Sequence, residues 1–147
     1  IVVEGIGDHG LEYMTGGKGV ILGDVGQNFG AGMSGGIAYV LPTNIEEFKF
    51  QCNTEMIEFE PLQNKQEVSE VRNLIIKHLE ETDSTLALNV LAKWEEMIPR
   101  FVKVVPTDYK VMLQKIEAFK EEGFKTEEAT LKAFTAVTTK SKVVVAK

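Results

Sequence analysis

Glycine is confined almost entirely to the start of this chain. The chain has 13 glycines among its 147 residues, and all but Gly123 lie within residues 1–36. Interior glycines each cost a helix about 0.5–1 kcal/mol relative to alanine, so a uniformly helical bundle is excluded. Collagen is excluded as well, because it needs glycine at every third position. The opening segment must therefore use glycine where the backbone turns tightly or approaches another backbone closely.

The glycine-rich segment also repeats itself. Residues 14–17 (Met-Thr-Gly-Gly) recur nineteen positions later at 33–36 (Met-Ser-Gly-Gly), and a short β-prone run follows each copy. Similar runs at 2–4 and 56–59 give three or four short strands about 18 residues apart. Such a short period is typical of a solenoid and leaves no room for crossover helices. The structural glycine corners would be Gly16, Gly17, Gly35 and Gly36.

These repeats predict a mainly β fold with a helical extension. The β part would be a right-handed parallel β-helix, that is, a single-stranded solenoid, followed by a C-terminal α-helical segment. A glycine-rich array of antiparallel hairpins is the alternative for the same repeats.

The remainder of the chain has helical patterning. Asn64 followed by Glu67 is a capping box, and apolar residues follow it at helical spacing. Helix starts are predicted at Asn64, at Asp83 or Ser84, at Thr107 and at Thr126, with stops at Pro99 and near Gly123, and 101–106 is predicted to be extended. The predicted organisation is 1–63 for the last coils of an N-terminally truncated β-helix, 64–137 for helices packed on it, and 138–147 for a tail.

Composition and charge narrow the function classes. The chain is 44% hydrophobic and 26% charged, which is ordinary for a globular protein, and its net charge of −6 disfavours nucleic-acid or anionic-membrane partners. Cys52 is the only cysteine, which excludes an internal disulfide. There is no signal peptide pattern, and the uncharged stretch 25–45 is too rich in glycine and polar residues to span a membrane. We therefore expect a cytoplasmic chain, and the first residue, Ile1, suggests a fragment or a processed product.

Two segments, 5–10 and 30–35, match the dinucleotide fingerprint G-x-G-x-x-G. Such a site needs a helix directly after the last glycine, because the helix N-terminus binds the pyrophosphate. Gly10 is followed by another glycine corner and Gly35 by a β-prone run, so chance matches are favoured. A nucleotide-binding enzyme is kept as a lesser alternative. Residues 32–36 also match the nucleophile elbow G-x-S-x-G, which likewise requires a following helix.

No catalytic, cofactor-binding or metal-binding residue is predicted. Asp8 and His9 form an acid–histidine pair without a third member, and His78 is expected to be a satisfied buried histidine. Cys52 has only Lys49 as a cationic neighbour to suggest activation, so it is expected to be a packed or half-exposed thiol. The aromatic side chains Trp94, Phe101 and Tyr109 are expected to pack against the solenoid.

Several segments together resemble the C-terminal domain of the glutamate synthase large subunit. They are 7–10, 12–17, 28–29, 31–40 and 53–56, and the run from Gly30 to Val40 is the most specific. The signature residues of this resemblance are Asp8, His9, Met14, Asn28, Met33 and Ser34. The resemblance extends over about residues 1–120. Leu11, Gln27, Thr107 and Val111 depart from the residues that are usual in that family.

The resemblance implies a β-helix of the G-x-G-x-G type that contains no catalytic residue. It would support the glutaminase and FMN synthase domains of an oxidoreductase that transfers the amide nitrogen of glutamine to 2-oxoglutarate. FMN and an iron–sulfur cluster would then be bound elsewhere in the parent enzyme, the partners would be its other domains or subunits, and this chain would be inactive alone. The alternative is a free-standing β-helix assembly subunit, either of a separately encoded glutamate synthase or of a formylmethanofuran dehydrogenase-like enzyme.

Overall fold

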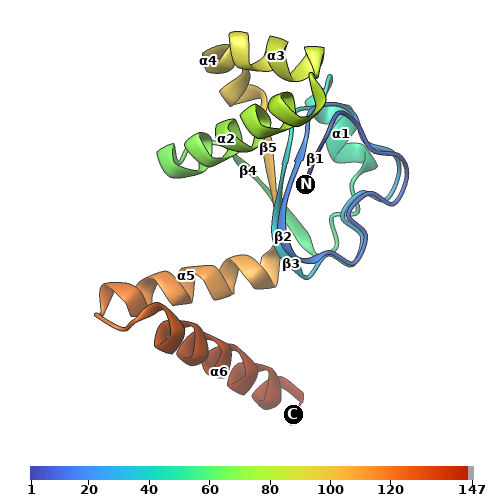
Figure 1. Cartoon of the computed structure of the whole chain (residues 1–147). Coiled ribbons are helices and arrows are strands. Elements are labelled where there is room, and N and C mark those ends of the chain that lie inside the picture. The colour runs from blue at the N-terminus through green and yellow to red at the C-terminus, as the bar shows by residue number, and fades with distance from the viewer. Residues whose placement is uncertain (146–147) are drawn as a thin grey trace. The chain divides into compact units, whose positions relative to one another are not determined.

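The computed structural model describes the backbone of residues 1–145 and the side chains of residues 1–138. The chain divides into two compact units, Ile1–Pro106 and Thr107–Lys147. The first unit contains β1 (Val2–Val3), β2 (Thr15–Ile21), β3 (Gly35–Val40), α1 (Ile45–Gln51), β4 (Ile57–Pro61), α2 (Lys65–Thr82), α3 (Thr85–Ala92), α4 (Trp94–Met97), the 3-10 turn η1 (Ile98–Arg100) and β5 (Val102–Pro106). The second unit contains α5 (Thr107–Glu121) and α6 (Thr126–Val145). The elements are labelled in Figure 1.

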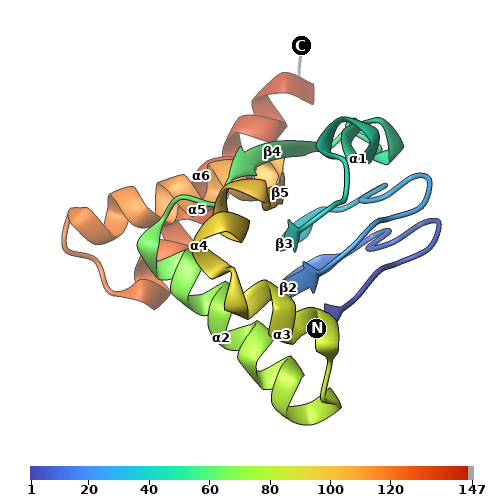
Figure 2. The same cartoon turned by 90° about the horizontal axis from the view of Figure 1, so that it is seen from above.

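The first unit is an α/β domain around one sheet of five strands in the order β1-β2-β3-β5-β4. Its first three strands are parallel, with Val2 opposite Val20 and Val20 opposite Tyr39. The long loops that lead from one of these strands to the next lie side by side (Figures 1 and 2). The glycine-rich repeats are therefore strand–loop units that lie in register with one another.

The prediction of a right-handed parallel β-helix is wrong. The expected fourth strand, β4, does not pair with β3, because β5 returns after α2–α4 and pairs antiparallel with β3. β4 then pairs antiparallel with β5, with Phe59 opposite Val104. The helix α1, capped by Asn44, also separates β3 from β4, so the parallel stack continues past β3 only as an isolated bridge between Phe29 and Cys52. A mixed sheet with helices replaces the solenoid.

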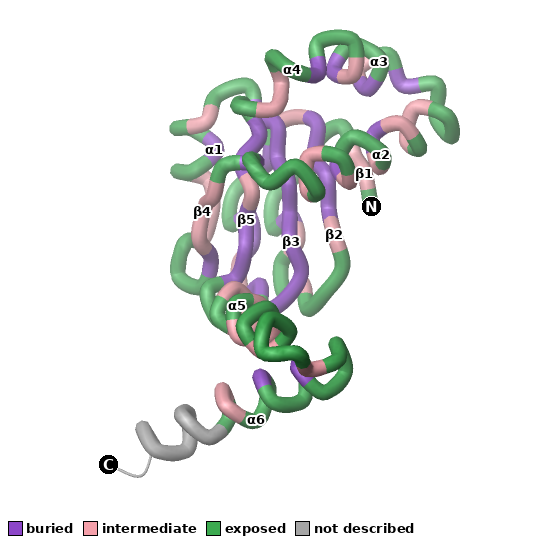
Figure 3. Tube along the Cα trace, turned by 90° about the vertical axis from the view of Figure 1, so that its left-hand side faces the viewer, coloured by how far each residue is buried: buried purple, intermediate pink, exposed green. Residues whose placement is uncertain are grey.

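The sheet is covered on both faces. α2 and α3 lie on one side of it, and the stacked loops and α1 lie on the other (Figures 1 and 2). Every residue of β3 is buried for this reason, and the buried segments concentrate in β2, β3 and β5 (Figure 3). On the loop side, Phe29 packs edge-on against Phe48 with ring centroids 5.7 Å apart, and Met33 is fully buried beside them.

Asn64 and Ser84 cap their helices as predicted, but the Glu67 carboxylate of the predicted capping box binds Lys103. Asn64 Oδ1 accepts hydrogen bonds from the backbone N–H of Gln66 and Glu67 at the start of α2. Ser84 Oγ accepts from the N–H of Ala87 at the start of α3. The segment assigned to a tail, 138–147, belongs to α6 as far as Val145, and residues 146–147 lie outside the described range.

A pair of alanine substitutions tests whether the parallel strands are in close backbone contact. A Cβ added at Gly35 would lie 2.2 Å from the carbonyl oxygen of Thr15, whereas one added at Gly16 meets nothing within 4 Å. We expect Gly35→Ala to lower the free energy of unfolding by about 2 kcal/mol or more, because β2 and β3 must separate. Gly16→Ala should change it by less than about 1 kcal/mol. Urea unfolding measures both, and equal effects would contradict the described register.

Candidate functional site

The loops between the parallel strands share one backbone conformation. Positive φ angles occur at His9 and again nineteen residues later at Asn28, with values of 61° and 60°. The same spacing relates Leu11 to Gly30 and Tyr13 to Gly32, all with positive φ. Positive φ is uncommon for leucine and tyrosine, so the fold imposes this conformation on the first loop even where the residue disfavours it. The signature residues His9 and Asn28 thus hold equivalent positions in successive loops.

Carboxylates join each loop to the next. The N–H of Gln27 donates to Asp8 Oδ1 at 2.7 Å, and the N–H of Thr43 donates to Asp24 Oδ1 at 2.8 Å, each across nineteen residues. A Cβ added at Gly26 would lie 2.2 Å from Asp8 Oδ1. The Asp8 carboxylate therefore occupies the space that a side chain at position 26 would need.

The other signature residues lie at the turn into β3. The N–H groups of Ser34 and Gly35 both donate to the carbonyl oxygen of Met14, at 2.9 and 3.2 Å. Met33 is fully buried, Met14 packs against the same hydrophobic cluster, and Ser34 is exposed. His9 is exposed, and its Nδ1 lies 3.6 Å from Glu12 Oε2. The structure therefore brings the two methionines to one core and leaves Ser34 and His9 at the surface.

The four predicted corner glycines lie within strands. Gly16 and Gly17 belong to β2, Gly35 and Gly36 belong to β3, and the pairing shifts register between Thr15 and Lys18. Gly17 and Gly36 both have a φ of 83°, a conformation that L side chains rarely adopt.

An ion-pair cluster lies between the sheet and α2. Lys103 Nζ on β5 lies 2.7 Å from Glu67 Oε1 on α2 and 3.3 Å from Glu60 Oε2 on β4. Burial by itself would lower the pKa of Lys103, but the hydrogen bonds and charges of Glu67 and Glu60 outweigh burial and raise this pKa. Tyr39, on β3, lies opposite Lys103. Burial, together with the carboxylates of Glu67 and Glu70, raises the pKa of the Tyr39 hydroxyl. The cluster keeps Lys103 charged and Tyr39 neutral.

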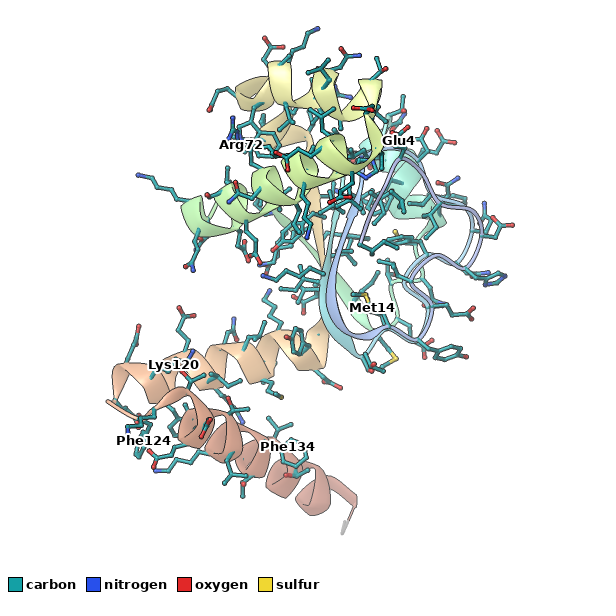
Figure 4. The ribbon with its side chains drawn as sticks, in the orientation of Figure 1. Glu4, Met14, Arg72, Lys120, Phe124 and Phe134 are labelled. Atoms are coloured by element: carbon teal, nitrogen blue, oxygen red, sulfur yellow. The ribbon has the colours of Figure 1, made fainter. Side chains whose placement is uncertain are left out.

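A second polar contact fastens the first strand to the helices. Ser84 Oγ donates a hydrogen bond to Glu4 Oε1, and His78 Nε2 lies 3.6 Å from the same oxygen. Glu4 is labelled in Figure 4. The expectation that His78 would be satisfied is not met, since its Nε2 is buried without a hydrogen bond among the described residues. Glu4 therefore ties the end of β1 to the junction of α2 and α3.

Sequence reasoning missed the partners of Glu4 and Lys103, because their contacts join segments far apart in the chain. One signal was available for Lys103. It interrupts the apolar run of β5, and a lysine at a buried strand position needs an anionic partner.

The residues do not fit an iron–sulfur cluster, one of the cofactors of the resembled family. Iron–sulfur clusters need several cysteine thiolates, and Cys52 is the only cysteine, with a pKa that burial raises to about 12. Within the part of the chain that the structure describes, no group of three or more His, Cys, Asp or Glu residues could hold a metal ion. Among the same residues, no helix combines the length and apolar character needed to cross a membrane.

The dinucleotide arrangement is also excluded. Turns and then β2 follow Gly10, and β3 begins at Gly35, so neither fingerprint opens a helix. β3 also follows Ser34 directly, and a nucleophile elbow would need a helix at that point, so this motif is excluded as well. Trp94 and Phe101 are buried, but against each other with ring centroids 5.8 Å apart and not against a solenoid, and Tyr109 is only half-buried.

The first unit is thus an α/β domain with a mixed sheet, in which carboxylates join the stacked loops and a lysine-centred cluster joins the sheet to α2. Residues 1–107 match the family model described as GXGXG motif, and the chain belongs to this family. It is 52% identical over 138 residues, 94% of its length, to "Glutamate synthase [NADPH] large chain" of Bacillus subtilis. It is 48% identical over 122 residues, 83% of its length, to "Glutamate synthase [NADH]" of Schizosaccharomyces pombe. It is also 41% identical over 105 residues, 71% of its length, to the chloroplastic ferredoxin-dependent glutamate synthase of Spinacia oleracea.

These matches cover most of this chain and fit a GXGXG domain of glutamate synthase. The chain spans 9% of the Bacillus subtilis relative and 6% of each of the other two. The matched segments are therefore small parts of much longer proteins.

Replacing the central lysine tests the cluster. Lys103→Met leaves the carboxylates of Glu60 and Glu67 facing each other without their cation, so we expect a loss of roughly 2–4 kcal/mol in the free energy of unfolding. Lys49→Met is the matched control, because Lys49 makes an exposed pair with Glu46 at 3.9 Å and should cost less than about 1 kcal/mol. Chemical unfolding at neutral pH compares them. A Lys103 effect as small as that of Lys49 would show that the cluster contributes little.

Proposed function

We propose that this chain is a structural domain of a glutamate synthase, and that it supports the glutaminase and FMN synthase domains without contributing a catalytic residue. The observation that carries this proposal is the family match over 1–107, which spans the whole stacked-loop unit. The parent enzyme would move the amide nitrogen of glutamine to 2-oxoglutarate, with FMN and its iron–sulfur cluster bound by other domains.

The chemistry of the loops supports a structural role. Asp8 and Asp24 use their carboxylate oxygens to accept backbone N–H groups of the next loop. Thr43 Oγ1 also donates to Asp24 Oδ2, at 3.0 Å, so both oxygens of that carboxylate bind the next loop. The loop carboxylates thus stabilise the backbone, as a rigid support between domains requires.

A hollow on the first unit offers room for another segment of the parent. An open groove of about 870 Å³ is lined by residues of α2, α4, η1 and the end of β4, among them Leu62, Val68, Arg72, Trp94 and Ile98. A lining that combines the apolar side chains of Leu62, Trp94 and Ile98 with Arg72 suits a surface that is covered on assembly.

The lengths of the matches bear on the electron donor. Because Ile1–Pro106 holds 106 residues, the alignment of 138 residues to the NADPH relative must include at least 32 residues of the second unit. By the same count, the alignment of 122 residues to the NADH relative must include at least 16. The ferredoxin-dependent relatives of Pyropia yezoensis and Spinacia oleracea match over 105 residues, which the first unit can hold by itself, but the one of Synechocystis matches over 109 and must include at least three residues of the second unit. The identities of 52% and 48% to the NADPH and NADH relatives exceed the 39–45% to these ferredoxin-dependent ones, and they support the proposal that the parent takes its electrons from NADPH or NADH.

Alanine substitutions in the parent enzyme test the structural role. His9→Ala and Ser34→Ala remove exposed polar side chains of the signature, so glutamate formation from glutamine and 2-oxoglutarate should stay within about twofold of the unaltered enzyme. A catalytic acid, base or nucleophile would lose about a hundredfold or more. Gly35→Ala is the control that should lower the melting temperature. A hundredfold loss in His9→Ala or Ser34→Ala at an unchanged melting temperature would contradict the proposal.

A further inference from the structure

A second hollow of the first unit lies at the carboxyl ends of two parallel strands. Leu22 directly follows β2 and Leu41 directly follows β3, and both buried side chains line the hollow. α3 adds Leu86 and Val90 to the lining. The hollow measures about 470 Å³, a volume that is usual for small-molecule sites. We call it the strand-end pocket, and its place agrees with the rule that open α/β sheets bind ligands outside the carboxyl ends of their parallel strands.

The charged groups that line the strand-end pocket are all cations. Lys93, which follows α3, and Arg100, the last residue of η1, line it, and no aspartate or glutamate does. Both cations are exposed, and neither pairs with a carboxylate among the residues that the structure describes. Arg100 Nη1 lies 3.7 Å from Met97 Sδ, but a thioether sulfur is a weak acceptor. The guanidinium and ammonium donors are therefore available to an anion.

The neighbouring carboxylate of Asp24 is already engaged. Its Oδ1 and Oδ2 accept hydrogen bonds from the N–H and Oγ1 of Thr43, at 2.8 and 3.0 Å, and Thr43 rather than Asp24 lines the pocket. The larger groove on α2 is different, because Glu95 lines it together with Lys65 and Arg72. Of these two hollows, only the strand-end pocket presents cations without a carboxylate in its lining.

Two cations beside aliphatic side chains fit an anion that carries two carboxylates on a short carbon chain. A guanidinium binds a carboxylate through two parallel hydrogen bonds, and an ammonium binds one as a point charge. Leu22, Leu41 and Val90 would cover the carbon chain. Inorganic phosphate would leave these apolar side chains unused, and a monocarboxylate would leave one cation without a partner.

We propose that the strand-end pocket binds a small aliphatic dicarboxylate, with Arg100 and Lys93 each binding one carboxylate. The bound ligand joins the end of α3 and η1 to the ends of β2 and β3, so it stabilises the first unit against unfolding. This binding does not depend on the proposed function, because all the residues that it uses lie within Ile1–Pro106.

The test is a titration of the complete 147-residue chain with glutarate at constant ionic strength. Butyrate and inorganic phosphate serve as comparison anions. Backbone amide chemical shifts give the place and the dissociation constant of binding, and melting temperatures give its effect on stability. The double variant Lys93→Met/Arg100→Met removes both cations of the pocket. Lys65→Met/Arg72→Met is the matched control, because it removes the same charge from the lining of the larger groove.

We expect glutarate to bind saturably, to shift the amides of Leu22, Thr43 and Asn89, and to raise the melting temperature. The double variant Lys93→Met/Arg100→Met should weaken binding by roughly tenfold or more, since a hydrogen bond to a charged group is lost at each end of the ligand. Arg100→Lys, which keeps the charge but loses the two-point hydrogen bonding, should weaken it less. The control variant should bind glutarate within about twofold of the unaltered chain, because its cations lie outside the pocket.

Three results would each overturn the proposal. The first is the absence of saturable shifts at the pocket amides in the unaltered chain. The second is equal weakening by the two double variants, which would show attraction by net charge alone. The third is binding of phosphate or butyrate as tightly as glutarate, which would show that the pocket does not recognise two carboxylates on a carbon chain.

Discussion

Backbone hydrogen bonds between successive glycine-rich loops hold the first unit together. The N–H of His9 donates to the carbonyl of Gln27 at 2.8 Å, and the N–H of Tyr13 donates to the carbonyl of Ala31 at 2.8 Å. These bonds require each loop to follow the path of the next, which explains why positive φ angles recur at a spacing of nineteen residues. Glycine is concentrated in residues 1–36 because a Cβ at several of these positions would strike the neighbouring backbone.

The stack ends where the sequence changes. After β3 there are no further glycines until Gly123, so the backbone cannot repeat the same close approach. α1 follows instead, and β5 occupies the free edge of β3 in the antiparallel direction. Lys103 on β5 then pairs with Glu67 on α2, which fixes the helical layer to the sheet at the point where the parallel strands end. The polar contacts of the unit thus serve packing between its layers.

Local chemistry predicted much of the fold, and long-range pairing did not follow from it. The repeat at 14–17 and 33–36 indicated parallel strands in register, because each copy is a short motif that can be recognised by itself. Asn64 indicated the start of α2 from the residues next to it. The solenoid prediction was wrong because β5 lies between β3 and β4 in the sheet. The residues near 57–61 give no sign of this, since β5 comes more than forty residues later in the chain. The partners of Lys103 and Glu4 were missed for the same reason. The family resemblance reached the correct family, since it depends on residue identity and not on the predicted topology.

Hydrogen exchange of individual backbone amides tests the central role of the stacked loops most directly. The amides of His9, Tyr13 and Gly30 donate to carbonyls of a neighbouring loop and not within their own. If the loops form one cooperative unit with the sheet, these three amides should exchange about as slowly as those of β3 and at rates similar to one another. Exchange of these loop amides at the rate of an unstructured chain, with β3 still protected, would contradict the account.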